Sequence, residues 1–316
     1  MNDIMLKMRK RSIRKISHKS AKSLFTTTGL FLCLYALSVL YLPPLVYGYL
    51  ISIESPILLG ISADYYALGI FYLIYVIFTI GIFYILSIVS GIHIKEICRP
   101  CAFSFKRYIT ESLLLTAITL FAWTFSGLLL NRFMISSPFL APIGMLQAEK
   151  YFTEPLYLFI FIIVAPFVEE FAYRGILLRL LGRFGNDFAV FAIAFIYAVA
   201  HTNLAEMFPS FIMSYLLAKL TLSKKSILPA VAVHMTFNSI LIPMVLIPEG
   251  YGFWVAIIIV AIIASAAAII FFRLNPDVVI KKQKQSKEVM AMFFKTPSVI
   301  IAILMMIIHS ILSYYL

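Results

Sequence analysis

Three ionisable residues lie within six positions of a stretch that is otherwise apolar. Residues 167–175 read FVEEFAYRG, and apolar segments flank them on both sides. A charged side chain in the middle of a bilayer costs at least about 2.5–3.5 kcal/mol, so these groups must face a protein interior. On a helix, Glu170 and Arg174 are four positions apart and can form an ion pair, whereas Glu169 points elsewhere. Glu169 is therefore left without a cation and is available for chemistry, unless all three residues form a purely structural polar network.

Two further groups of polar residues follow this segment. Tyr197 lies one turn before His201 in YAVAHTN, and His234 and Asn238 share a helix face in HMTFN. At 1.5 Å per residue from the cytoplasmic helix ends, Glu169, His201 and Asn238 lie roughly 17–21 Å deep and His234 roughly 11 Å deep. Four polar groups on three helices are therefore expected to meet in one layer of the membrane.

A carboxylate, two imidazoles and a carboxamide in a sheltered cavity suit the hydrolysis of a peptide bond. Glu169 would take a proton from a water molecule, and His201 would share that water and pass a proton to the leaving amine. His234 and Asn238 would donate hydrogen bonds to the developing oxyanion. Glu169, His201 and His234 could instead bind zinc, but the sequence lacks the HExxH spacing that makes such a site specific. A site without a metal or other cofactor is therefore the preferred interpretation.

The composition indicates that membrane-spanning helices position these residues. Of 316 residues, 62% are hydrophobic and 13% are charged, whereas soluble domains carry about 25% charged residues. The net charge of +12 does not indicate nucleic-acid binding, because no basic patch is interleaved with aromatic residues in a polar segment. The sequence therefore predicts an all-α, polytopic transmembrane helical bundle that interacts with the lipid bilayer and not with nucleic acid.

Nine apolar segments approach or exceed the roughly 20 residues that a helix needs to cross a bilayer. The fifth and sixth are short and weakly separated, so a bundle of eight spans is the alternative. The first is followed by no convincing cleavage site and is interpreted as a retained anchor. The nine segments are 24–44, 65–90, 108–131, 155–181, 187–203, 205–222, 226–247, 252–273 and 296–316.

The positions of lysine and arginine predict the orientation of the bundle. With nine spans, 23 of the 26 basic residues fall in the N-terminal tail and in alternate loops. By the positive-inside rule, the N-terminus is expected in the cytoplasm and the C-terminus outside. The tail mixes apolar and basic residues, so it would either lie along the anionic inner leaflet or form a solvated topology signal.

One of the predicted cytoplasmic loops contains Cys98 and Cys101 in a lone CxxC. A structural zinc site usually needs a second pair of ligands, which this loop lacks. Two free thiols are the preferred interpretation of this pair, and a redox or metal-binding role is the alternative.

The three polar motifs together resemble those of the CPBP family, which comprises CAAX proteases and bacteriocin-processing enzymes and is also called the Abi family. Residues 169–174, EEFAYR, match its EExxxR motif, and residues 234–238, HMTFN, match its HxxxN motif. Residues 197–201, YAVAH, resemble its FxxxH motif with Tyr197 in place of phenylalanine. The resemblance is specific because the motifs occur in order on successive predicted helices, and it covers residues 154–247.

This resemblance implies an intramembrane endopeptidase related to the type II CAAX prenyl endopeptidase. In the family, now usually described as glutamic-type and formerly as metal-dependent, the first glutamate and the second-motif histidine are thought to activate water. Carried over to this chain, these residues are Glu169 and His201, with His234 and Asn238 stabilising the oxyanion. The supporting residues are Glu170, Arg174 and Tyr197.

The predicted spans and the resemblance divide the chain into four parts. The first two are a basic cytoplasmic tail at 1–23 and three transmembrane helices within 24–153. The catalytic core follows at 154–247. The last part, 248–316, holds two C-terminal transmembrane helices with a basic cytoplasmic loop at 274–295.

The expected substrate is a peptide or protein that is membrane-associated or prenylated at a CAAX-type terminus, or a leader or signalling peptide. The expected location is the plasma membrane of a prokaryote. A non-catalytic immunity or regulatory protein of the same fold is the main alternative, although retention of all four polar groups argues against a degenerate site. A transporter with a glutamate proton relay is disfavoured, because no inverted repeat is evident.

Overall fold

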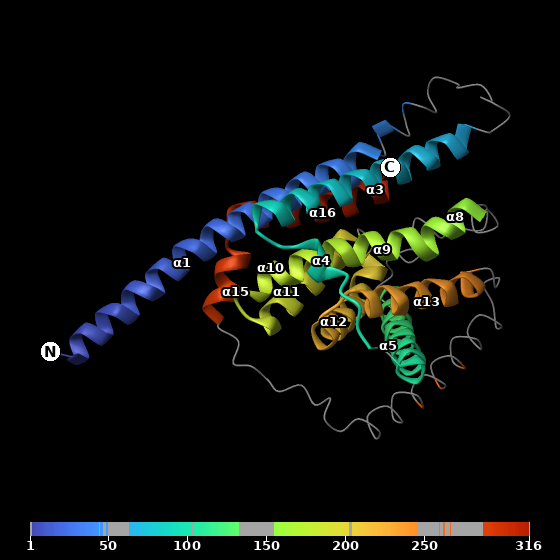
Figure 1. Ribbon diagram of the computed structural model, residues 1–316. Helices are drawn as coiled ribbons and strands as arrows, with labels where there is room; N and C mark the ends of the chain where they lie inside the picture. The colour runs from blue at the N-terminus through green and yellow to red at the C-terminus, as the bar shows by residue number, and fades with distance from the viewer. Residues whose placement is uncertain are drawn as a thin grey trace.

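The computed structural model shows helices joined by turns and loops throughout the residues that it describes (Figure 1). These residues are 2–43, 45, 46, 49, 63–102, 104–132, 155–201, 204–245, 259, 262, 266 and 287–315. No strand occurs among them, so the predicted all-α fold is confirmed for this part of the chain.

The described helices fall into three groups along the chain, and stretches with π-helical winding are labelled η. The N-terminal group comprises α1 (Asn2–Tyr35), η1 (Ala36–Tyr41), α3 (Ala63–Val89), α4 (Ile94–Ile97) and α5 (Phe105–Arg132). The middle group comprises α8 (Pro155–Phe159), η3 (Ile160–Val164), α9 (Ala165–Glu169), η4 (Glu170–Leu177), α10 (Leu178–Gly182), α11 (Asn186–Ala200), α12 (Leu204–Lys224) and α13 (Leu228–Val245). The C-terminal group comprises α15 (Lys287–Phe294) and α16 (Pro297–Tyr315).

Three of the described helices are long and apolar enough to cross a membrane, namely Lys19–Tyr41, Gly69–Val89 and Pro155–Gly182. A fourth span is obtained if α15 and α16, which meet at a bend of 63°, are counted together. These apolar helices indicate an integral membrane protein, but the predicted nine spans are not confirmed. The predicted span at 252–273 lies outside the described residues, apart from three isolated positions.

The consecutive segments from α8 to α10 form one central rod between two groups of helices (Figure 1). On one side this rod contacts α3, which packs on α1, and α1 packs in turn on α16. On the other side the rod contacts α11 and α13, and α5 packs against both α12 and α13. The middle of the chain therefore runs through the centre of the bundle, where other helices can shelter its polar side chains.

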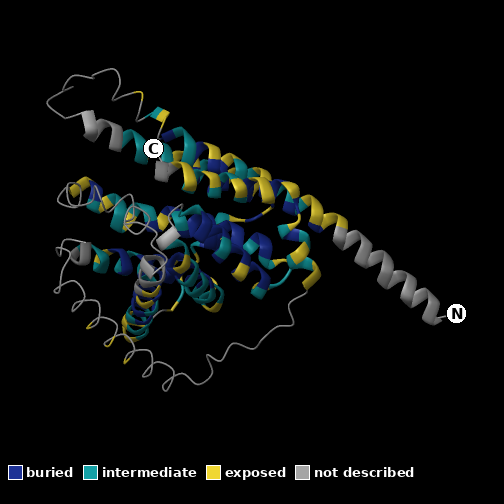
Figure 2. Cartoon of the chain, turned by 180° about the vertical axis from the view of Figure 1, so that it is seen from behind, coloured by how far each residue is buried: buried dark blue, intermediate teal, exposed yellow. Residues whose placement is uncertain are grey.

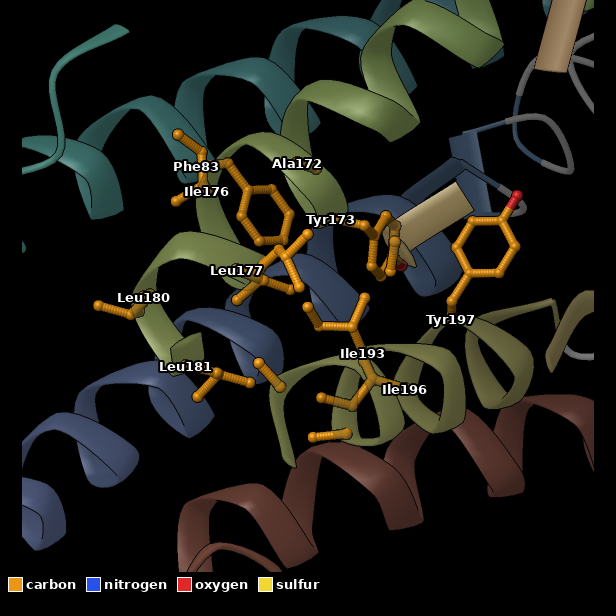
Figure 3. Packing of buried hydrophobic residues seen from close by; sticks show 14 of the residues in the cluster. Phe83, Ala172, Tyr173, Ile176, Leu177, Leu180, Leu181, Ile193, Ile196 and Tyr197 are labelled. Carbon is orange, nitrogen blue, oxygen red and sulfur yellow. The ribbon is translucent and has the colours of Figure 1, made fainter. Parts of the chain in front are cut away.

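Apolar packing fixes the central rod against α11. Buried residues are dense where these two elements meet (Figure 2). Ile176 and Leu177 of η4 lie together with Ile193 and Ile196 of α11 in this cluster (Figure 3). Complete burial of one such aliphatic side chain contributes about 1.5–3 kcal/mol. The polar residues of η4 are therefore anchored by apolar neighbours within the same two turns.

The last part of the segment expected as a basic cytoplasmic loop, 274–295, contains a short helix, α15, at residues 287–294. Phe293 of this helix is fully buried. Its ring packs edge-on against Phe25 of α1 and Phe188 of α11, with centroids 5.2 and 5.5 Å away. The apolar spacing in KEVMAMFF favours a helix with one buried face, and the lysines of the longer segment obscured this local pattern.

Helix α1 runs without a break from the expected tail at 1–23 into the first membrane-spanning segment. Its N-terminal end extends beyond the rest of the bundle (Figure 1). Farther along, α1 crosses α16 closely at Gly29, where an added Cβ would lie 2.3 Å from Ser298 Oγ. Small residues permit such close approach between membrane helices, so this crossing holds the two ends of the chain together.

The loop after α3 docks on the central rod. Ile97 of α4 packs on Gly175 of η4, where an added Cβ would lie 2.8 Å from the Ile97 Cγ2 atom. Cys98 and Cys101 in this loop are free thiols. Burial raises the pKa of the Cys98 thiol, although nearby Arg179 lowers it. A raised pKa leaves less of the reactive thiolate, which agrees with the interpretation of this pair as free thiols.

Candidate active site

The segment that carries the two glutamates is wound differently from the regular α-helix expected over 155–181. Residues Ile160–Val164 and Glu170–Leu177 are π-helical. After the second stretch, for example, the N–H of Leu178 donates to the carbonyl of Tyr173, five residues earlier. Such π-helical turns are rare in proteins as a whole. Those that do occur often lie at functional sites. The apolar pattern at 155–181 predicts a helix but gives no indication of the π-helical winding of these two stretches.

Glu169 is the last residue of α9, and its carboxylate is held by two tyrosine hydroxyls. Tyr75 on α3 donates to Oε1 at 3.1 Å, and Tyr197 on α11 donates to Oε2 at 2.5 Å. Within the described part of the chain, no lysine, arginine or histidine forms an ion pair with this carboxylate. Each carboxylate oxygen has a second lone pair, so Glu169 can still accept a proton from a water molecule.

Glu170 and Arg174 form the ion pair that their spacing predicts. The distance from Oε1 to Nη1 is 2.9 Å, and neither side chain is exposed. The Arg174 guanidinium also lies 4.6 Å from the centre of the Tyr197 ring, which is a cation–π contact. Removal of one partner from a buried ion pair leaves the other charge uncompensated. These two residues therefore stabilise the site, and their charges are already balanced.

His234 contacts the same buried glutamate. Its Nδ1 atom lies 3.0 Å from Glu170 Oε1, and its side chain is 3% exposed. A carboxylate oxygen accepts a hydrogen bond, so Nδ1 donates and Nε2 is the ring nitrogen left for the site. Donation from Nε2 to an oxyanion would require a proton on both ring nitrogens.

His201 is the C-cap residue of α11 and lies in the turn directly after the helix, near the end of the expected span at 187–203. Its Nδ1 atom lies 2.8 Å from the Tyr197 carbonyl oxygen, and the two ring centroids are 4.4 Å apart. Because a carbonyl only accepts, Nδ1 carries the proton and Nε2 of the neutral ring carries a lone pair. Glu169 and His234 are both close enough to interact electrostatically with His201.

Asn238 is buried on α13 and joins this helix to the central rod. Its Nδ2 atom donates to the Phe161 carbonyl in η3 at 2.8 Å. Pro166, five residues after Phe161, has no N–H and cannot make the i+5 hydrogen bond of a π-helix to that carbonyl. Asn238 therefore uses one amide hydrogen within the fold and has a second one that can reach an oxyanion.

The donors of the alternative zinc site do not assemble into a metal site. Within the described ranges, no three His, Cys, Asp or Glu side chains lie close enough together to hold a metal ion. The expected ligands Glu169, His201 and His234 each bond to protein groups instead. A catalytic zinc site needs three convergent protein ligands and an open position, and the contacts of these three residues with protein groups favour the metal-free alternative.

Tyr75 is the residue of the site that the sequence analysis missed. It lies 94 residues before Glu169 and belongs to none of the three motifs. The signal in the sequence was a polar side-chain tip within an apolar segment, but Tyr72 one turn earlier gives the same signal. Tyr197 was expected only as a support, and its hydroxyl contact with Glu169 places it directly at the site.

The match to a known family falls on this part of the chain. Residues 151–240 match the family described as type II CAAX prenyl endopeptidase Rce1-like, a range that includes the three motifs. Neither a search of curated proteins nor a search of solved structures found a match. Residues 151–240 are therefore similar to the type II CAAX prenyl endopeptidase family, and this similarity agrees with the resemblance that the three motifs carry.

Proposed function

We propose that this protein is an intramembrane endopeptidase in which Glu169 activates a water molecule for attack on a peptide bond, without a bound metal. The setting of the Glu169 carboxylate carries the proposal. Among the described residues it has no cationic partner, and a neutral hydroxyl holds each of its oxygens. The family match over 151–240 supports an endopeptidase activity.

In the proposed reaction, Glu169 takes a proton from the water as the water oxygen attacks the carbonyl carbon of the scissile bond. The new C–O bond gives a tetrahedral intermediate with one negatively charged oxygen. When the C–N bond breaks, the nitrogen takes a proton and leaves as an amine, and the acyl part leaves as a carboxylic acid. His201 is suited to this second transfer, because its Nε2 lone pair can receive the proton and pass it on.

His234 and Asn238 are proposed to stabilise the negative oxygen of the intermediate. Each has one donor position that its described contacts leave unused, Nε2 of His234 and the second amide hydrogen of Asn238. One donor of this kind contributes about 10²–10³-fold to kcat in enzymes that use an oxyanion hole. Glu170 orients His234 through Nδ1, so the buried ion pair and the oxyanion donors form one unit.

The proposed substrate is a peptide or protein at the membrane, with a prenylated CAAX-type C-terminus as the first candidate. The matched family is described as a prenyl endopeptidase. Exposed apolar side chains at Phe159, Ile163 and Phe167 also run along the central rod toward Glu169, and an apolar surface of this kind suits a lipid-modified chain. An unprenylated leader or signalling peptide is the second candidate.

The proposed location is the plasma membrane of a prokaryote, with the N-terminus in the cytoplasm and the C-terminus outside. The alternation of basic loops supports this orientation. A reporter enzyme that folds only outside the cytoplasm should be active when fused to the C-terminus and inactive when fused to the N-terminus. The reverse pattern, or activity at both ends, would contradict the orientation.

The test of the activity uses the purified full-length protein in detergent with a farnesylated CAAX peptide and an unprenylated leader peptide as reporters. The wild type should cleave at least one reporter, and Glu169→Gln should cleave neither while it elutes and unfolds like the wild type. Excess chelator should leave the wild-type rate unchanged. Loss of activity with chelator and recovery with zinc would overturn the metal-free reaction.

Two results would contradict the proposed activity itself. Cleavage by Glu169→Gln at the wild-type rate would show that another group activates the water. Failure of the wild type to cleave either reporter would favour the alternative of a non-catalytic immunity or regulatory protein of the same fold.

A further inference from the structure

The hydroxyl of Tyr75 reaches the candidate active site from outside the segment that matches the family. Tyr75 belongs to α3, whereas the match begins at residue 151. Its hydroxyl donates to Glu169 Oε1 at 3.1 Å. Helix α3 contacts the central rod in both α9 and η4, the two segments that meet at Glu169. Helix α3 therefore contributes a side chain to the site as well as packing surface.

Tyr197 provides the second hydroxyl, from the opposite side of the rod. It donates to Glu169 Oε2 at 2.5 Å from α11. The corresponding position in the FxxxH motif is phenylalanine, which has no hydroxyl, so this contact comes from the residue in which the chain departs from the motif. Both oxygens of one carboxylate are therefore held, each by a different helix.

The Tyr197 ring is itself fixed in place. Tyr173 packs edge-on against it with centroids 4.9 Å apart (Figure 3). The guanidinium of Arg174 lies 4.6 Å from the ring centre, and the imidazole of His201 lies 4.4 Å away. A ring packed on three sides cannot swing its hydroxyl away from Glu169 without breaking these contacts.

We propose that Tyr75 and Tyr197 are positioning residues that hold the Glu169 carboxylate in the orientation needed to take a proton from water. The proposal rests on the proposed function of Glu169 as the base. With one hydroxyl on each oxygen, the carboxylate cannot rotate about its last side-chain bond without losing a hydrogen bond. One lone pair of each oxygen still faces away from the tyrosines, so the water can approach a carboxylate of fixed orientation.

The role predicts a specific kinetic signature for variants that lose only a hydroxyl. Tyr75→Phe and Tyr197→Phe should each lower kcat about 10-fold, and the double variant about 100-fold, because small misplacements of a catalytic group cost up to about 10²-fold. KM should not change, because neither hydroxyl is placed to touch the substrate. Loss confined to KM would show contact with the substrate and would overturn the positioning role.

Tyr41→Phe is the matched control. The Tyr41 hydroxyl donates to the Met305 carbonyl at 2.6 Å, in the contact between η1 and α16. Like the other two variants, it removes a hydrogen-bonded tyrosine hydroxyl, but from a position away from Glu169. It should therefore keep the wild-type kcat and KM. An equal loss of kcat in all three variants would show a general effect of removing a tyrosine hydroxyl and would also overturn the proposal.

A second measurement reports on the hydrogen bonding of the Glu169 carboxylate and does not require substrate turnover. The infrared band of the Glu169 carboxylate, identified by its absence in Glu169→Gln, should shift in Tyr75→Phe and Tyr197→Phe and stay in place in Tyr41→Phe. If the wild type cleaves and Glu169→Gln does not, but the double variant keeps the wild-type kcat, the positioning role is wrong and the proposed function stands. If the wild type cleaves neither reporter, the proposed function fails and the positioning role fails with it.

Discussion

Glu169 and Glu170 are adjacent in the sequence but have opposite electrostatic surroundings. Glu170 is fully buried and contacts two basic side chains, Arg174 and His234. Glu169 is half-buried and contacts only hydroxyl groups among the described residues. The charge of one carboxylate is therefore balanced within the fold, and the other remains able to take a proton. Balance of charge, and not place in the motif, separates Glu170 from Glu169, the proposed base.

The two glutamates also differ in where their partners come from. Both basic partners of Glu170 lie within residues 151–240, the segment that matches the family. Glu169 takes one partner from that segment, Tyr197, and one from α3, Tyr75. Glu170 is thus held entirely from within the family segment, whereas Glu169, the proposed base, also takes a contact from a helix outside it.

The largest effect on stability is expected at Arg174. Arg174→Met should lower the free energy of unfolding by about 3–5 kcal/mol, because it leaves the Glu170 charge buried without its cation. The double variant Glu170→Gln/Arg174→Met removes both charges and should recover much of this loss. Thermal unfolding in detergent measures both changes. A single variant as stable as the wild type would show that the pair does not hold the site together.

The largest effect on activity outside Glu169 is expected at His234. His234→Gln should lower kcat about 10²–10³-fold, because it removes a donor to the oxyanion. His309→Gln is a matched control in another helix, where the imidazole packs on Tyr41 with centroids 5.1 Å apart. Cleavage kinetics should separate the two variants clearly. Equal rates would show that His234 has no part in the reaction.

The smallest effect is expected at the pair between Asp187 and Lys219. Their atoms are 2.8 Å apart, but the side chains are 18% and 21% exposed. Asp187→Asn should therefore cost about 1 kcal/mol or less, as is usual for ion pairs that water reaches. Unfolding in low and high salt would check this, because salt screens such a pair. A loss as large as that of Arg174→Met would contradict the argument that burial makes the Glu170 pair important.

The local part of the site could be predicted from the sequence, because helical spacing brings residues together within one or two turns. The ion pair between Glu170 and Arg174 and the placement of Tyr197 beside His201 follow from such spacing. The hydrogen bond from His234 to Glu170 joins residues 64 positions apart. Contacts of that kind, like that of Tyr75, depend on how whole helices pack, and no periodic pattern in the sequence encodes them.

The fold, like the site, could be predicted from the sequence only in part. The all-α class followed from composition alone, but the nine expected spans are not confirmed among the described residues. The π-helical stretches were not expected either, since the pattern of apolar residues does not distinguish a π-helical turn from an α-helical one. The helix at 287–294 was hidden for a different reason, because its apolar face follows a lysine-rich stretch.

The most direct test makes the same chemical change at both glutamates. Glu169→Gln and Glu170→Gln each replace a carboxylate by an amide of nearly the same shape, one position apart. Cleavage rate and unfolding temperature should be measured for both variants in the same detergent. Glu169→Gln should lose about 10³-fold in kcat and unfold at the wild-type temperature, whereas Glu170→Gln should unfold at a clearly lower temperature. A Glu169→Gln variant that keeps its activity, or that loses stability as Glu170→Gln does, would contradict the separation of the two roles.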